Sequence, residues 1–156
     1  MRLIVALAMS MVVGSALAMP NTDDDLGASS GFWKDWGITA SLISCQPADD
    51  HYACDYRIVH QHGIEASFRS SGAGSEVTSF MVTKQGGEDV VFLITAATAI
   101  KAIAPELGPE EREALVKELF GTALSDGSAE KNGSGWSIRI GRIFASAWMV
   151  EGRVTD

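Results

Sequence analysis

The stretch DYRIVHQHGIEASFR, residues 55–69, carries the clearest hydropathy pattern in the chain. Tyrosine, isoleucine, histidine, alanine and phenylalanine fall on the even-numbered positions, and mostly polar or charged side chains fall on the odd ones. A period of two residues is typical of a strand that buries one face in an antiparallel sheet. We therefore predict one long strand, with Gly63 as a bulge. The alternative is a turn at His62-Gly63 that divides the segment into two strands, although a two-residue turn would mix the two faces.

Similar alternation predicts further strands on both sides of this segment. One runs from Trp36 to about Cys45, a second covers residues 76–84, and one or two lie within residues 136–150, where Gly141 would bend the chain. Two intervening stretches are expected to be irregular because they are rich in turn-forming residues, and these are the Gly/Ser loop 70–75 and the polar linker 125–135.

Two consecutive helices are expected between these groups of strands. Residues 90–94 favour a strand by propensity, but apolar side chains recur at helical spacing through the alanine-rich segment 88–104, and we predict a helix there. The second helix begins at Pro109, because the proline ring suits a first helical turn. It ends at one of two glycines, Gly121 or Gly127.

This order of elements indicates an α+β fold. We predict an antiparallel β-sheet of about four to six strands that is covered on one face by two consecutive helices. A chain of 156 residues suits one domain with one hydrophobic core, and we assign that domain to residues 32–156. Residues 19–31 are acidic, contain glycine and serine and show no periodicity, so we expect a flexible N-terminal arm there.

The first eighteen residues have the pattern of a secretory signal peptide. Arg2 supplies the positive charge, Leu3 to Val13 is apolar, and small residues precede a cleavage site after Ala18. The apolar stretch is shorter than the about 20 residues that a permanent membrane anchor needs. We therefore predict residues 1–18 to be cleaved and the protein to be exported, to a bacterial periplasm or to the medium, without a membrane anchor.

Both cysteines, Cys45 and Cys54, lie in the exported part of the chain. Two cysteines in an oxidising compartment predict one disulfide bond. Closing so short a loop stabilises the fold by roughly 2.5–3 kcal/mol in the chain-entropy treatment. The alternative, a redox-active pair, lacks the usual Cys-x-x-Cys spacing.

The charge balance and the motif search exclude several classes of function. The formal net charge is -8, from 12 Lys and Arg against 20 Asp and Glu, whereas proteins that bind nucleic-acid backbones are basic on their binding face. The chain has no Gly-x-Ser-x-Gly motif, and Gly72-Ala73-Gly74 lacks the frame of a dinucleotide-binding fingerprint. We therefore expect no nucleic-acid partner, no cofactor and no assembled catalytic set.

The histidines are the one candidate for metal chemistry. His60 and His62 stand two residues apart on the predicted strand, so their imidazoles would leave the same face and could bind zinc or copper. His51, between the two cysteines, would be a third ligand if that loop folds back. The alternatives are hydrogen-bonded histidines at the rim of the sheet, or a packing role that responds to pH.

Tryptophan residues lie near both ends of the predicted domain. Trp33, Trp36, Trp136 and Trp148 fill one core if the terminal strands are neighbours. In the functional alternative they form an exposed patch for a protein partner, with Arg139 and Arg142 at its rim, since Trp and Arg are common in binding hot spots.

Taken with the absence of a catalytic motif, these features predict a small exported binding protein without enzymatic activity, such as an inhibitor or immunity-type partner of another exported protein. The first alternative is a metal-binding protein or small enzyme that uses the histidine pair. The second is a carrier of a small apolar ligand.

Overall fold

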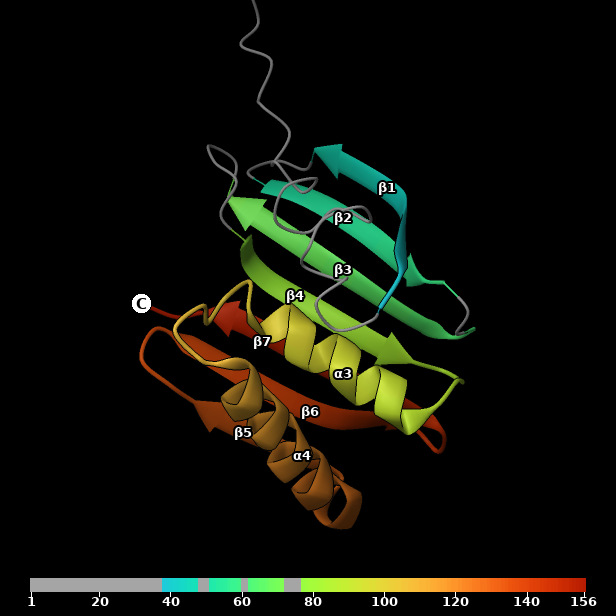
Figure 1. Cartoon of the computed structure of the whole chain (residues 1–156), viewed down its shortest axis with the longest axis vertical. Coiled ribbons are helices and arrows are strands. Elements are labelled where there is room, and N and C mark those ends of the chain that lie inside the picture. The colour runs from blue at the N-terminus through green and yellow to red at the C-terminus, as the bar shows by residue number, and fades with distance from the viewer. Residues whose placement is uncertain (1–37, 48–50, 60–61, 72–76) are drawn as a thin grey trace, which may run out of the picture.

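The structure, a computed structural model, describes residues 38–47, 51–59, 62–71 and 77–156. Among these residues it contains seven strands and two helices, which are coloured by position in Figure 1. In chain order they are β1 (Ala40–Pro47), β2 (His51–Ile58), β3 (Ile64–Ser71), β4 (Val77–Lys84), α3 (Asp89–Ile100), α4 (Pro109–Asp126), β5 (Ser128–Asn132), β6 (Trp136–Phe144) and β7 (Ala147–Val154).

All seven strands form one antiparallel sheet in the order β1-β2-β3-β4-β7-β6-β5. The two helices are inserted between β4 and β5, and β7 then returns to pair with β4 in the middle of the sheet (Figure 1). The expected α+β fold is therefore confirmed. The sheet has more strands than the predicted four to six because one predicted strand is a hairpin and one predicted linker is a strand.

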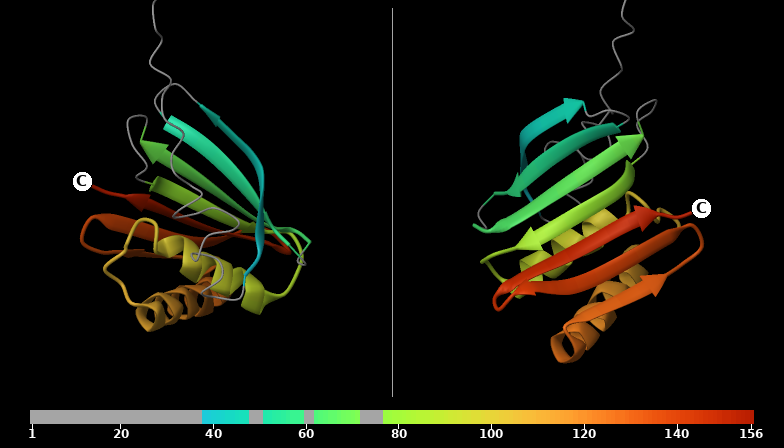
Figure 2. Two further views of the ribbon diagram at one scale, coloured as in Figure 1. Left: turned by 45° about the horizontal axis from the view of Figure 1, so that its top comes forward. Right: turned by 180° about the vertical axis from the view of Figure 1, so that it is seen from behind.

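Both helices lie on the same face of the sheet. Helix α3 packs over β4 and β3, and α4 packs over β5 and β6. When the molecule is seen from behind, the helices lie beyond the strands, and no described helix covers the near face (Figure 2, right). We call this near face the open face. Within the part of the chain that the structure describes, neither helix is long and apolar enough to cross a membrane.

The hydrophobic core lies between the sheet and the two helices. The rings of Phe92 on α3 and Phe120 on α4 are 6.3 Å apart, and Phe120 lies 4.9 Å from Trp148 on β7. On the neighbouring strands, Phe68 and Phe80 are 6.4 Å apart. Each such side chain contributes about 1.5–3 kcal/mol when it is fully buried, so this layer supplies most of the driving force for folding.

The prediction of one long strand over residues 55–69 is wrong. The chain turns after Ile58 and returns as β3, with Arg57 opposite Glu65 and Tyr56 opposite Ala66. Partners in this hairpin have the same parity, so even-numbered residues stay on the buried face in both strands. For that reason the alternation could not distinguish a hairpin with an odd-length loop from one continuous strand.

Gly63 makes this turn possible. Its φ of +80° lies in the left-handed region, which residues other than glycine rarely adopt. A Cβ at this position would also stand 2.8 Å from the backbone nitrogen of Gly86. The Gln85 N–H donates a hydrogen bond of 2.7 Å to the Gly63 carbonyl oxygen, so the β2–β3 turn packs directly against the end of β4.

The polar linker predicted at residues 125–135 contains a strand, β5. Its side chains are mostly exposed and include Glu130 and Lys131 because β5 is the last strand of the sheet, where charged residues discourage pairing with other chains. Gly141 is not a bend between strands but lies inside β6, and the β6–β7 turn falls at residues 145–146.

Both predicted helices are confirmed, with α3 ending at Ile100 rather than at residue 104. Burial of one side of α3 outweighs the strand propensity of its first residues, and the hydroxyl groups of Thr95 and Thr98 are satisfied by hydrogen bonds to carbonyl oxygens one turn earlier. Helix α4 begins at Pro109, where the Gly108 N–H donates a 2.7 Å hydrogen bond to the Glu111 carboxylate.

Candidate functional site

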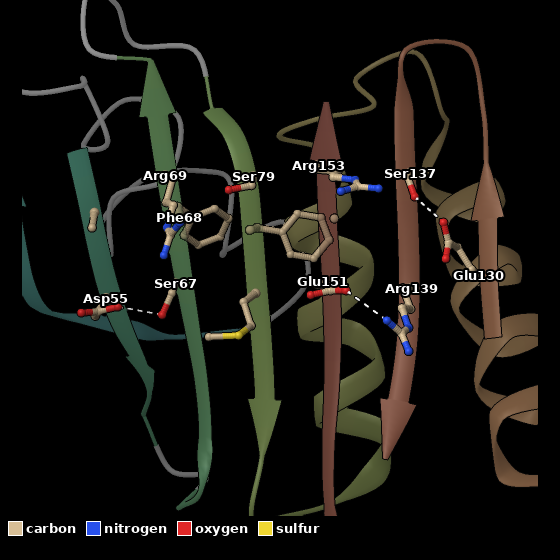
Figure 3. A pocket seen from close by; sticks show the side chains of 14 residues that line it. Asp55, Ser67, Phe68, Arg69, Ser79, Glu130, Ser137, Arg139, Glu151 and Arg153 are labelled. Atoms are coloured by element: carbon tan, nitrogen blue, oxygen red, sulfur yellow. Dashed lines mark hydrogen bonds and ion pairs between the residues drawn. The ribbon is translucent and has the colours of Figure 1, made fainter. Parts of the chain in front are cut away.

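A hollow of about 530 Å³ lies on the open face (Figure 3). Side chains from six strands, β2 to β7, line it, and we call it the open-face hollow. Its charged residues are three arginines and three carboxylates: Arg69, Arg139, Arg153, Asp55, Glu130 and Glu151. Alternate residues of adjacent strands point to this face, so the polar half of each strand's alternation forms its lining.

Strand register arranges this lining in rows that cross the sheet. The row through the centre of the hollow, which we call the middle row, consists of register partners on all seven strands: Ser44, Asp55, Ser67, Met81, Glu151, Arg139 and Glu130. Neighbouring members lie about 5 Å apart, which lets their side chains interact directly.

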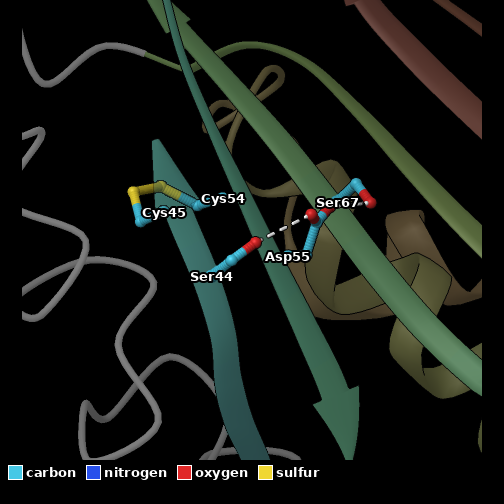
Figure 4. The surroundings of a disulfide bond; sticks show 5 residues. All are labelled: Ser44, Cys45, Cys54, Asp55 and Ser67. Atoms are coloured by element: carbon cyan, nitrogen blue, oxygen red, sulfur yellow. Dashed lines mark hydrogen bonds between the residues drawn. A yellow bond between two sulfur atoms is a disulfide. The ribbon is translucent and has the colours of Figure 1, made fainter. Parts of the chain in front are cut away.

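Asp55 is held by hydroxyl groups on both sides. Ser67 Oγ donates a hydrogen bond of 2.7 Å to Asp55 Oδ1, and Ser44 Oγ donates one of 3.2 Å to Oδ2 (Figures 3 and 4). Each donor comes from a neighbouring strand, so the two contacts fix the orientation of the carboxylate. Asp55 is a preorganised, half-buried acceptor at one end of the hollow.

The other acids of the middle row are less firmly held. Arg139 Nη1 lies 4.0 Å from Glu151 Oε1, the outer limit for an ion pair, and both side chains are about half exposed. Glu130 accepts a hydrogen bond of 3.1 Å from Ser137 Oγ. An exposed pair of this kind contributes little to stability, and its carboxylate can accept a further cation.

The next row towards the end of β7 is cationic. Arg69 on β3 and Arg153 on β7 flank Ser79 on β4, since Ser79 is the register partner of both. We call these three residues the arginine row. Within the described part of the chain, both guanidinium groups are exposed and neither has an ion-pair or hydrogen-bond partner. Two exposed guanidinium groups two strands apart, without a partner among the described residues, have the chemistry to bind an anion.

A β-bulge lies next to the arginine row. Arg69 pairs with Ser79 but Ser70 pairs with Val77, so Thr78 is an extra residue on β4. Thr78 Oγ1 donates a hydrogen bond of 3.3 Å to the carbonyl oxygen of Arg69. Bulges often re-aim side chains beside functional sites, and this one is the local irregularity that sets the position of Arg69.

The predicted disulfide is confirmed. Cys45 and Cys54 are register partners on β1 and β2, with Cα atoms 4.0 Å apart, and their bond lies on the face opposite that of Ser44 and Asp55 (Figure 4). The register of β1 shifts between Leu42 and Ser44. The disulfide therefore fixes the register beyond this irregularity and holds Ser44 against Asp55.

The structure describes the backbone of two of the three histidines, His51 and His62, and they lie at opposite ends of β2. His62 is exposed in the β2–β3 turn, His51 begins β2 at the far end of that strand, and His60 lies outside the described residues, as does the side chain of His51. An eight-residue strand separates His51 from that turn, which corresponds to roughly 25 Å. Among the described residues, no three His, Cys, Asp or Glu side chains are placed to hold a metal ion. The His60–His62 pair stays a prediction.

The tryptophans that the structure describes belong to the core. Trp136 and Trp148 are buried, the Trp136 indole N–H donates a 2.7 Å hydrogen bond to Glu106 Oε1, and the Arg142 guanidinium stacks 4.8 Å from the Trp148 ring. Arg142 thus covers a core side chain, whereas Arg139 lines the open-face hollow. These two arginines do not border a common patch.

Several further predictions concern segments outside the described residues. Trp33 and Trp36, the signal peptide (1–18) and the N-terminal arm (19–31) lie there.

A second hollow, of about 410 Å³, lies at the connection between α3 and α4. Arg112 is buried beside it, and its Nη1 donates a 3.1 Å hydrogen bond to the Leu107 carbonyl oxygen. Burial lowers the pKa of Arg112 from its ordinary value, because desolvation disfavours the charged form. This contact holds the connection against α4, which is a structural role.

Most of the open-face hollow is not predicted from the sequence. Of its charged residues, only Arg139 is among the predicted site residues. The available signal was the polar half of the strand alternation, where Asp55, Arg69, Glu151 and Arg153 all fall on odd-numbered positions. Their convergence depends on cross-strand register, which the alternation does not contain.

Comparisons with known proteins leave the function to be argued from this geometry. No protein-family model, no curated protein and no solved structure matches the chain. The fold and the hollow therefore define the class only as an α+β domain with a charged, open sheet face.

Proposed function

We propose that this chain is a small exported binding protein without enzymatic activity, which binds another exported protein through the open-face hollow. The observation that carries this proposal is the arginine row, in which Arg69 and Arg153 are exposed and have no ion-pair partner among the described residues, beside the acids of the middle row. Arginine is among the residues that contribute most to protein–protein binding. An inhibitor or immunity-type protein is the kind of molecule that fits this description.

The lining favours a polar partner over an apolar ligand. Sites for small apolar molecules are lined mainly by hydrophobic and aromatic side chains. The open-face hollow instead contains three arginines, three carboxylates and three serines. Of its larger apolar members, Phe68 and Phe80 are buried in the core and Met81 is exposed. Such a surface resembles the charged, hydrogen-bonding part of a protein interface.

Export is supported by two independent features. The sequence begins with a signal-peptide pattern, and the disulfide between Cys45 and Cys54 suits an oxidising compartment. A bacterial periplasm is the compartment that we propose.

The experiment compares three forms of the purified, oxidised protein as baits for a periplasmic extract. Wild type should retain one stoichiometric partner, and the double variant Arg69→Ser, Arg153→Ser should lose it. Arg57→Ser is the matched control, because Arg57 is an exposed arginine on the same face that pairs with Glu65 at 3.3 Å and does not line the hollow.

Equal retention by wild type and by the double variant would contradict the proposal, and so would the absence of any specific partner. Thermal unfolding of all three baits checks that they are equally folded.

A further inference from the structure

We propose that the occupant of the open-face hollow is an extended segment of the partner protein in which an acidic residue stands two positions from a basic one. This inference rests on the proposed function and specifies the chemistry that the partner presents. The acidic side chain lies over Ser79 between Arg69 and Arg153, and the basic side chain lies over Met81.

The acidic side chain of the partner segment binds at the arginine row. Arg69 and Arg153 are separated by one strand, so their Cα atoms lie about 10 Å apart, and one carboxylate between them is within reach of both long side chains. In Figure 3, Arg153 extends towards Ser137 and Arg69 runs along β3, so that neither covers Ser79. A carboxylate here gains two charge-assisted contacts, and among the described residues it displaces no existing ion pair.

The basic side chain of the partner segment binds at the middle row. Met81 is 39% exposed and lies between Ser67 and Glu151 in that row. The stem of a lysine or arginine can pack on the methionine while its charged head reaches a carboxylate, as long basic side chains commonly do at interfaces. Glu151 is the nearest acid, and its distance of 4.0 Å from Arg139 leaves it able to accept this second cation.

The spacing of the two rows selects the spacing in the partner. Ser79 and Met81 are two residues apart on β4, a separation of about 6.6 Å, and two residues of any extended peptide span the same distance on one face. A segment that runs along β4 therefore brings its first and third side chains over the two rows. A segment with adjacent opposite charges points one of them away from the sheet.

The net charge of the chain also favours a partner segment that carries both an acidic and a basic residue. The chain as a whole carries a formal net charge of -8, so a uniformly acidic partner would be repelled before it reached the arginine row. A segment that carries both signs avoids this repulsion and complements both rows.

The test uses the purified, oxidised protein and three short blocked peptides of Gly and Ser. One contains Asp-x-Lys, the second has Asp and Lys adjacent, and the third has Asn-x-Gln. Titration is followed by NMR, which reports both the dissociation constant and the residues affected. We expect the Asp-x-Lys peptide to bind about tenfold more tightly than the other two, as two charge-assisted contacts allow. The Arg69→Ser, Arg153→Ser variant should lose this preference, and Arg57→Ser should keep it.

Equal binding of the three peptides, or a preference that persists in the double variant, overturns the inference. If the peptides bind equally while capture of the partner still depends on Arg69 and Arg153, the inference fails and the proposed function stands. If the double variant does not fold, Arg69→Gln and Arg153→Gln are measured singly, and each should remove part of the preference. A single variant that removes none of it counts against the inference.

Discussion

Ser67 donates a hydrogen bond of 2.7 Å to Asp55 across the β2–β3 pair, on the face of the sheet that the helices leave open. We expect Ser67→Ala to lower the free energy of unfolding by about 1 kcal/mol, because the carboxylate loses its shorter hydroxyl partner. A double-mutant cycle with Asp55→Asn should give a coupling energy of about 1 kcal/mol by urea denaturation. Ser79→Ala, on the same face of β4, is the matched control. Additive effects of the Ser67 and Asp55 changes would show that the contact does not stabilise the fold.

The disulfide should contribute measurably to stability because it joins β1, which pairs only with β2 in the described sheet, to its neighbour. Replacing Cys45 and Cys54 with serine should lower the free energy of unfolding by about 2–3 kcal/mol, since the unfolded chain loses a covalent constraint. Denaturation with and without reductant gives the comparison. Reductant should lower the free energy of unfolding of the wild type to that of the double variant, and it should leave the free energy of unfolding of that variant unchanged. A wild type whose stability is unaffected by full reduction contradicts this prediction.

Gly152 on β7 leaves room for a core ring. A Cβ at Gly152 would stand 2.2 Å from Phe80 Cε1 and 2.7 Å from Ile103 Cδ1. Gly152→Ala should therefore destabilise the protein by about 1–3 kcal/mol through overpacking, measured as a lower denaturation midpoint. Gly141→Ala on the adjacent strand β6 is the control, because its nearest contact would be Ser128 Cβ at 3.8 Å. If both substitutions have the same effect, the close approach of Phe80 is not the cause.

The β2–β3 turn should be sensitive to substitution at Gly63. Alanine there must adopt a φ near +80° and meets the Gly86 backbone, so we expect Gly63→Ala to cost about 1–2 kcal/mol or more. Gly121→Ala makes the same chemical change inside helix α4, where the new Cβ meets no heavy atom within 4 Å apart from the helix's own backbone and the neighbouring residues. That variant should be more stable than wild type by about 0.5–1 kcal/mol. The two variants are compared by thermal unfolding. Shifts of the same sign in their midpoint temperatures would contradict the prediction.

Some features of the fold could be predicted because they depend on neighbours along the chain. Helix α4 begins at its proline, and its first turn carries the acids that a helix N-terminus prefers. The disulfide could be predicted because the chain contains two cysteines and they have one possible pairing. The two layers of the fold followed from the order of strands and helices, since each element has one apolar face to bury.

Other features depend on which strands become neighbours. Residues 55–69 have the same alternation as one strand or as a hairpin, and only the packing of Gly63 against Gly86 distinguishes the two. Strand β5 could not be predicted from hydropathy, because an edge strand that packs under a helix on one side needs few apolar residues. Arg139 and Arg142 look like one group in the sequence, but they are three positions apart on β6 and therefore lie on opposite faces of the sheet.

The amino-acid sequence by itself determined the α+β class, both helices, the pairing of the cysteines and the side chains available for an open polar surface. Tertiary structure alone decided that Arg69, Ser79 and Arg153 stand in one row beside Asp55 and Glu151. Local patterns report which face of a strand a side chain takes, because that alternates with every residue. They do not report its cross-strand partner, because register is set by turns, bulges and the return of β7 to the middle of the sheet.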